Sequence, residues 1–186
     1  MGGGDKCLRS LGGRPILAHV IDRAAPQVGP LVLNANGDAA RFAAFGLPVA
    51  PDVVGGFAGP LAGVLTGMTW AAANAPECRW LASFATDAPF FPRDLVARLL
   101  AAVAKDGAEL ACAASGGRHH PVFGLWPVAL ADDLHRAMTR EDIRKVDVWT
   151  ARYRLAVATF ETDRTDPFFN TNRPDDLAEA EGVIAS

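Results

Sequence analysis

The stretch "RWLASFATDAPF", residues 79–90, combines the pattern of a buried strand with a charged group at its end. Its near-continuous apolar run, 79–87, is typical of a strand covered on both faces of a sheet. Asp87 leaves this run, and Pro89 follows it closely. Strands buried on both faces occur mainly in α/β domains, so this stretch predicts that similar runs occur elsewhere in the chain.

Further apolar runs alternate with segments of helical periodicity. The strand-like runs are 29–36, 47–52, 108–115, 120–127 and 154–162. The helix-like segments are 14–25, 59–74, 92–105, 139–152 and 171–185. This alternation predicts an α/β domain with a mostly parallel sheet. The order of the last two strand-like runs departs from strict alternation, and we expect an antiparallel edge there.

The composition favours one domain over residues 1–186, with half of the residues hydrophobic. A net charge of -3 with no basic run argues against binding to nucleic acid or to a membrane surface. No apolar run is long enough to span a bilayer, and the start lacks the regions of a signal peptide. Three widely separated cysteines indicate reduced thiols. We therefore expect a cytoplasmic protein.

Polar side chains stand at the ends of several predicted strands. Asn34 and Asn36 end one run, Asp52 ends the next, and Asp87 ends the third. In open α/β sheets, ligands bind beyond the carboxyl ends of the strands, so these groups form a candidate site. The alternative is that each residue only starts a turn or caps a helix. A single carboxylate such as Asp87 suits Mg²⁺, which keeps water and substrate phosphate among its ligands.

Two glycine-rich stretches could approach an anionic ligand. "MGGGDK" supplies Gly2, Gly3, Gly4 and Lys6, which could cradle phosphate, although a flexible terminus has the same composition. It is not a Walker A loop, because no Ser or Thr follows the lysine. In "FAGPLAG", Gly59 stands at a helix start that could hold an anion or simply pack closely.

Two later stretches could contact substrate. "GGRHHPVF" (116–123) places His120 in a polar turn without the spacing of a zinc site. "FFNTN" (168–172) offers the amides of Asn170 and Asn172, which could instead cap the following helix. No hydrolase pattern emerges, since there is no G-x-S-x-G elbow and Ser10, Ser83 and Ser115 have no evident histidine partner.

The chain resembles the molybdenum cofactor guanylyltransferases of the MobA type over essentially its whole length. The segments "MGGGDK", "VLNAN", "APD", "GPLAG", "ATDAPF", "HHPVF" and "FFNTNRPDDL" occur in that family's order. The resemblance implies a three-layer α/β/α, Rossmann-like nucleotidyltransferase fold. It also implies transfer of GMP from GTP to molybdopterin with Mg²⁺, and release of pyrophosphate. Molybdopterin-delivering proteins and acceptor molybdoenzymes are further partners that it suggests.

The resemblance also implies roles for individual residues. Lys6 and Asp87 would be catalytic, with Asp87 at the Mg²⁺ and GTP position. The remaining nucleotide contacts would be Gly2, Gly3, Gly4, Asn34, Asp52 and Gly59. The molybdopterin side would be formed by His120, Asn170 and Asn172.

The family's signature departs from this chain at its start. It begins earlier, with an apolar strand, then Leu-Ala-Gly-Gly, then an arginine shortly before the Met-Gly that opens this sequence. We therefore expect the native polypeptide to be longer, with Met1 internal, and the chain as given to bind GTP poorly. The alternatives are a molybdopterin cytidylyltransferase that uses CTP, and a non-catalytic nucleotide- or cofactor-binding protein that has lost its loop.

Overall fold

The computed structural model describes residues 5–56, 59–162, 165–171 and 174–185. The strands are β1 (Ser10–Leu11), β2 (Arg14–Pro15), β3 (Leu33–Asn34), β4 (Val49–Ala50), β5 (Trp80–Ser83), β6 (Leu110–Ser115), β7 (Arg118–Pro127) and β8 (Leu155–Phe160). The α-helices are α1 (Ile16–Ala24), α2 (Pro60–Asn74), α3 (Leu95–Asp106), α4 (Ala131–Arg140), α5 (Val146–Thr150) and α6 (Pro174–Ala185). Among the described residues, no helix is long and apolar enough to cross a membrane.

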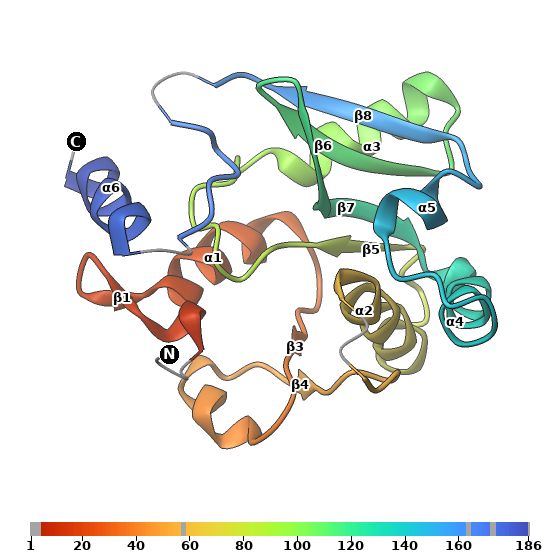
Figure 1. The fold of residues 1–186 in the computed structure, drawn as a ribbon, viewed down its shortest axis with the longest axis horizontal. Coiled ribbons are helices and arrows are strands. Elements are labelled where there is room, and N and C mark those ends of the chain that lie inside the picture. Colours follow the sequence, from red (N-terminus) through yellow and green to blue (C-terminus); the bar gives the residue numbers. More distant parts are fainter. Residues whose placement is uncertain (1–4, 57–58, 163–164, 172–173, 186) are drawn as a thin grey trace.

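The largest sheet has the order β5-β7-β6-β8 (Figure 1). Strand β7 is antiparallel to both of its neighbours, whereas β6 and β8 are parallel, so β5, β6 and β8 run in one direction. The predicted α/β class with a mostly parallel sheet is therefore confirmed. The antiparallel strand, however, lies inside the sheet and not at the expected edge.

A tight hairpin explains the position of β7. Ser115 pairs with Arg118, which leaves a loop of Gly116 and Gly117 with φ values of 52° and 75°. Two consecutive residues with positive φ form the turn that best matches the twist of a hairpin, and glycine adopts this backbone without steric cost. The chain therefore returns directly beside β6, in the antiparallel direction.

Neighbouring residues of the central strands enter separate hydrophobic cores. Ala111 and Leu125 pack in a cluster with Leu99 of α3, whereas Leu110 and Trp126 pack in another cluster that α2 and α4 help to form. Successive side chains of a strand point to opposite faces of a sheet, so helices cover both faces. This arrangement confirms the predicted three layers (Figure 1).

The predicted helix over 139–152 is wrong. Helix α4 ends at Arg140, and α5 begins only at Val146. Between them Asp142 has a φ of 53°, a left-handed conformation that interrupts a helix. Thr139 lies inside α4, where its hydroxyl donates to the carbonyl of His135.

A smaller parallel sheet stands apart from the main one. Leu33 pairs with Val49, and Asn34 pairs with Ala50. The β3–β4 pair and the main sheet are separate within the described residues, and β5 is the edge strand of the main sheet. The ends of β3, β4 and β5 nevertheless lead to one region, where the candidate site lies.

Replacement of Gly124 by Ala is expected to destabilise the fold. A Cβ atom at this position would lie 2.4 Å from the ring of Trp126, which is fully buried and donates a hydrogen bond to the Ser83 hydroxyl. Overpacking of this kind costs about 1–3 kcal/mol, with a fall in Tm of roughly 2–4 °C per kcal/mol. Gly182→Ala makes the same change in open space within α6 and should leave Tm unchanged or higher. Equal thermal unfolding curves for the two variants would contradict the expectation.

Candidate active site

The ends of β3 and β4 carry a cluster of amide and carboxylate groups. Asn34 Nδ2 donates to Asp52 Oδ1 at 2.9 Å, and Asn36 Nδ2 donates to Asp52 Oδ2 at 2.8 Å. The Asp52 backbone N–H donates in return to Asn36 Oδ1 at 2.8 Å. A Cβ atom at Gly63 of α2 would lie 2.8 Å from Asn34 Oδ1, so the small residue leaves room for the amide. The expected meeting of strand ends is thus present, and the cluster is held from several sides.

Asp87, at the end of the run that begins with β5, is fixed through its backbone. Its carbonyl oxygen accepts hydrogen bonds from the Thr171 backbone N–H at 2.8 Å and from the Thr171 hydroxyl at 2.9 Å. Burial raises the pKa of the Asp87 carboxyl, while a backbone hydrogen bond and the charge of Lys6 lower it. The carboxylate is therefore partly dehydrated, and the positive charge of Lys6 acts on it.

The segment that contains Lys6 is tied to the loop after β3. Asp5 forms an ion pair with Nε of Arg41. The Nη1 atom of the same arginine donates to the carbonyl of Asp38 at 2.6 Å. A further Arg41 nitrogen donates to the carbonyl of Asn36. Arg41 thus anchors the short 3₁₀ turn Lys6–Leu8, which places Lys6 near Asp87.

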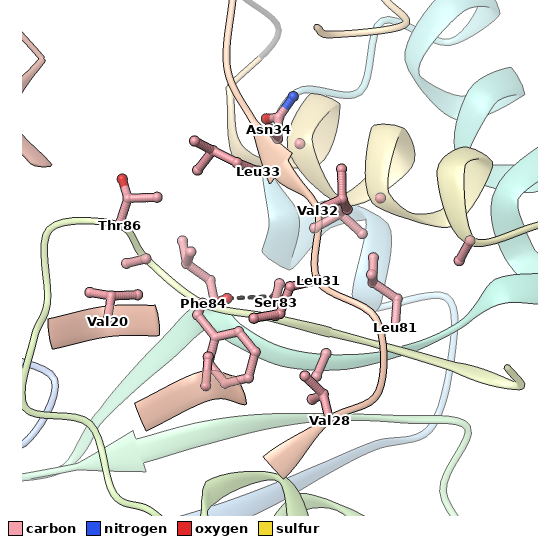
Figure 2. Close-up of a pocket in the computed structure, with 18 of the residues that line it drawn as sticks. Val20, Val28, Leu31, Val32, Leu33, Asn34, Leu81, Ser83, Phe84 and Thr86 are labelled. Atoms are coloured by element: carbon pink, nitrogen blue, oxygen red, sulfur yellow. Dashed lines mark hydrogen bonds between the residues drawn. The ribbon is translucent and has the colours of Figure 1, made fainter. Parts of the chain in front are cut away.

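Asn34, Asp52 and Asp87 line one cavity of about 620 Å³, part of which Figure 2 shows, whereas Lys6 is not among its lining residues. The predicted site residues that line it are Asn34, Asp52, Gly59, Asp87 and Asn170. Gly59 has a φ of 72° at the start of α2, a backbone conformation that glycine adopts readily. Four predicted residues lie outside the described part of the chain: Gly2, Gly3, Gly4 and Asn172.

His120 does not line this cavity, but it supports a segment that does. Its Nε2 lies 2.6 Å from the Ser115 hydroxyl, which donates to Asp166 Oδ1 at 2.7 Å. Because the hydroxyl has one proton and gives it to Asp166, we assign the proton of the first bond to His120 Nε2. The imidazole also stacks on Phe168 with ring centroids 4.6 Å apart. These contacts hold the segment that leads to Asn170.

The expectation that no serine has a histidine partner is wrong for Ser115. The hairpin brings His120 beside it, since the two residues lie at the ends of paired strands β6 and β7. Ser115 is nevertheless fully buried, so its hydroxyl has a structural role and cannot reach a substrate.

Two positioning residues were missed from the sequence. The Thr171 hydroxyl binds the Asp87 carbonyl. Its position between Asn170 and Asn172 in "NTN" could have indicated a separate role for Thr171, because alternate side chains of an extended segment point to opposite sides. Arg41 lies in a short 3₁₀ segment that no strand or helix pattern predicts.

A divalent cation fits the Asp87 end of the cavity. Within the part of the chain that is described, no group of three or more His, Cys, Asp or Glu residues could enclose a metal ion. A single, partly dehydrated carboxylate suits a divalent ion that takes most of its ligands from water and phosphate.

Thr171→Val is expected to destabilise the protein modestly. The variant keeps the backbone hydrogen bond to Asp87 but loses the hydroxyl bond, and its shape is nearly unchanged. The expected loss is about 1 kcal/mol in the free energy of unfolding, measured by urea denaturation. Thr171→Ser keeps the hydroxyl and serves as the control; a Val variant as stable as the Ser variant would show that the hydroxyl bond contributes nothing.

The partly buried His120 should make stability fall in weak acid. Burial is the largest cause that lowers the pKa of this imidazole, and the charge of Asp166 opposes it in part. The folded state therefore binds fewer protons than the unfolded state between the lowered pKa and about 6.5, so stability rises with pH across this window. His120→Gln should flatten that rise, as measured by urea midpoints at several pH values. His135→Gln, on the exposed face of α4, is the control that should retain it.

Comparisons with known proteins give the family. The family model of the MobA-like NTP transferase domain matches residues 1–158. A molybdenum cofactor guanylyltransferase of Bradyrhizobium sp. (strain ORS 278) is 60% identical, over 100% of this chain and 87% of that protein. A protein of the same name from Rhodopseudomonas palustris (strain HaA2) is 58% identical, over 98% and 86%.

Solved structures share the fold at low identity. The molybdopterin-guanine dinucleotide biosynthesis protein A of Archaeoglobus fulgidus superposes with a TM-score of 0.71 at 21% identity, over 98% of this chain and 92% of that one. A 2-C-methyl-D-erythritol 4-phosphate cytidylyltransferase of Thermus thermophilus superposes with a TM-score of 0.65 at 20% identity, over 97% and 94%. The predicted nucleotidyltransferase fold is confirmed, and the chain belongs to the MobA-like NTP transferase family.

Proposed function

We propose that this protein transfers GMP from GTP to the terminal phosphate of molybdopterin and releases pyrophosphate. The observation that carries this proposal is the meeting of the β3, β4 and β5 ends at one cavity, with Asp87 near Lys6. Relatives more than half identical over the whole chain bear the name of this activity. The product is the guanine dinucleotide form of the cofactor.

The reaction needs positioning and charge stabilisation more than a protein nucleophile. A phosphate oxygen of molybdopterin forms a bond to the α-phosphorus of GTP. The bond from that phosphorus to the oxygen bridging to the β-phosphate breaks, and pyrophosphate leaves with the electron pair. Lys6, whose charge lowers the pKa of the Asp87 carboxyl, is proposed to stabilise the charge of the triphosphate. This chemistry agrees with Ser115 being buried and bonded, since the acceptor phosphate is itself the nucleophile.

We assign the cation to Mg²⁺, held by Asp87. When bound, the ion neutralises charge on the phosphates of the nucleotide. Thr171 keeps the Asp87 backbone in place, so the carboxylate stays at the end of the run that begins with β5 while the charge of the substrate changes. Asn34 and Asp52 are proposed to contact the guanine nucleoside; because their amide and carboxylate are already bonded to each other, they present a fixed surface to it.

The molybdopterin side is proposed to include Asn170, which is exposed and lines the cavity. His120 is proposed to act on this side through the segment that it supports, and Asn172 through its nearness to Asn170 in the sequence. Proteins that deliver molybdopterin and molybdoenzymes that accept the product are the proposed partners, in the cytoplasm.

The fold alone does not determine which nucleotide base the protein uses. The same architecture occurs in a cytidylyltransferase, whereas the relatives more than half identical to this chain are named for guanine. We therefore propose GTP over CTP. Pyrophosphate release measured with either nucleotide, in the presence of Mg²⁺ and molybdopterin, tests this choice; equal or greater release from CTP would overturn it.

Asp87→Asn is expected to lower kcat/KM about 100-fold or more, the usual loss when a charge-stabilising group is removed. Pyrophosphate release is the measurement, and Asp106→Asn, exposed at the end of α3, is the control that should keep full turnover.

Burial raises the pKa of the Asp87 carboxyl. The folded state therefore binds more protons than the unfolded state between the ordinary and the raised pKa, and it loses stability as pH rises through this window. The Asn variant should therefore be at least as stable as the parent at pH 7. Unchanged turnover in a folded Asn variant would contradict the proposed role.

A further inference from the structure

A second, smaller cavity lies between α5 and the strands β6, β7 and β8. Its volume is about 260 Å³. Cys112 and Trp126 are buried residues of its lining, whereas the lining residues His119, Asp147 and Ala151 are exposed. The cavity therefore extends from the hydrophobic core to the surface, and we call it the α5 recess.

The α5 recess adjoins the larger cavity. Pro121 of β7 lines both of them. At the start of α5, Val146 lines the larger cavity, and the next residue, Asp147, lines the recess. A molecule in the recess would therefore have one end beside the cavity in which the nucleotide is proposed to bind.

An irregularity in β7 forms the wall between the two cavities. The register of the β6–β7 pair shifts between Cys112 and Ala113, which leaves residues 121–123 of β7 in a bulge. Bulges bend a strand and redirect its side chains, and they are frequent beside active sites. Just before the bulge, successive side chains point to opposite faces of the sheet, so His120 supports the segment before Asn170 while His119 lines the recess.

Hydrogen bonds and ring contacts fix the walls of the α5 recess. Trp149 Nε1 and the Tyr153 hydroxyl both donate to Asp133 Oδ2, at 3.1 and 2.5 Å. The ring centroid of Trp149 lies 6.0 Å from that of Trp126 and 5.3 Å from that of Tyr153. Since Trp126 and Tyr153 line the recess, its shape is set before a ligand arrives, which lowers the entropic cost of binding.

The lining suits a flat heterocycle with a polar edge. Pro121 and Trp126 supply apolar surface. Burial raises the pKa of the Cys112 thiol to about 11, so this buried group stays uncharged at neutral pH. Asp147 adds a carboxylate whose Oδ1 accepts from the Val148 backbone N–H at 3.0 Å, which fixes its direction. Apolar walls with a few placed polar groups are typical of small-molecule sites.

We propose that the α5 recess binds the pterin ring system of molybdopterin. Asp147 accepts hydrogen bonds from the N–H groups on the ring edge, and the terminal phosphate extends past Pro121 into the larger cavity. The recess is smaller than a typical ligand site of roughly 300–1,000 Å³, which suits one ring system and not the whole molecule. This inference rests on the proposed function, which supplies the acceptor.

The test fills the recess from its exposed rim. Ala151→Phe places a large side chain among the lining residues, whereas Val148→Phe, on the exposed face of α5 and outside the lining of both cavities, is the matched control. The probe is 6-hydroxymethylpterin, titrated into the full chain without nucleotide and followed by amide chemical shifts. We expect shifts at Asp147 and Leu155 in the parent and in the control, and binding weaker by about tenfold or more in Ala151→Phe, because the added ring occupies the same space.

A second variant tests the polar contact. Asp147→Asn keeps the shape of the side chain but removes its charge, so it should weaken binding of the pterin by roughly fivefold or more. Equal affinity of the parent and this variant would overturn the assigned role of Asp147.

Turnover measurements separate this inference from the proposed function. In Ala151→Phe the KM for molybdopterin should rise about tenfold or more while the KM for GTP stays unchanged, because only the acceptor is displaced. An unchanged KM for molybdopterin in the folded variant would overturn the recess and leave the proposed function standing. Pterin binding that Ala151→Phe abolishes, in a protein that transfers no nucleotide, would support the recess and contradict the proposed function.

Two results of the binding assay would overturn the recess directly. One is the absence of shift changes at its lining up to about 5 mM probe, a range in which small fragments bind their sites. The other is equal affinity of Ala151→Phe and Val148→Phe for the pterin.

Discussion

The contact between Thr171 and the Asp87 carbonyl is the constraint on which the proposed catalytic geometry depends. It joins the end of the β5 run to the segment before α6, across a sequence separation of 84 residues. That segment is itself held by Asp166, which accepts from Ser115, and by Phe168, which stacks on His120. The Asp87 carboxylate is therefore positioned by the last part of the chain as well as by the segment that follows β5.

The two polar groups at the cavity differ in how their charges are compensated. Both carboxylate oxygens of Asp52 accept hydrogen bonds from asparagine amides, which fix the direction of the group. Burial raises the pKa of Asp87, so its charge is compensated less completely by the protein. A group in this condition gains most from a bound cation, whereas the Asn34–Asp52 pair is suited to contacts of fixed direction. This division agrees with a nucleoside at one end and phosphates at the other.

Local patterns predicted much of the fold because its strands are short, apolar and bounded by polar residues. The strand ends at Asn34, Asp52 and Asp87 were found this way, since ligand groups follow apolar runs in α/β domains. The place of β7 was not predicted, although the Gly116–Gly117 pair is a recognised hairpin signal. The break at Asp142 has no such signal, because it depends on a left-handed backbone between two helices. Thr171 and Arg41 act over long sequence separations, which periodicity does not report.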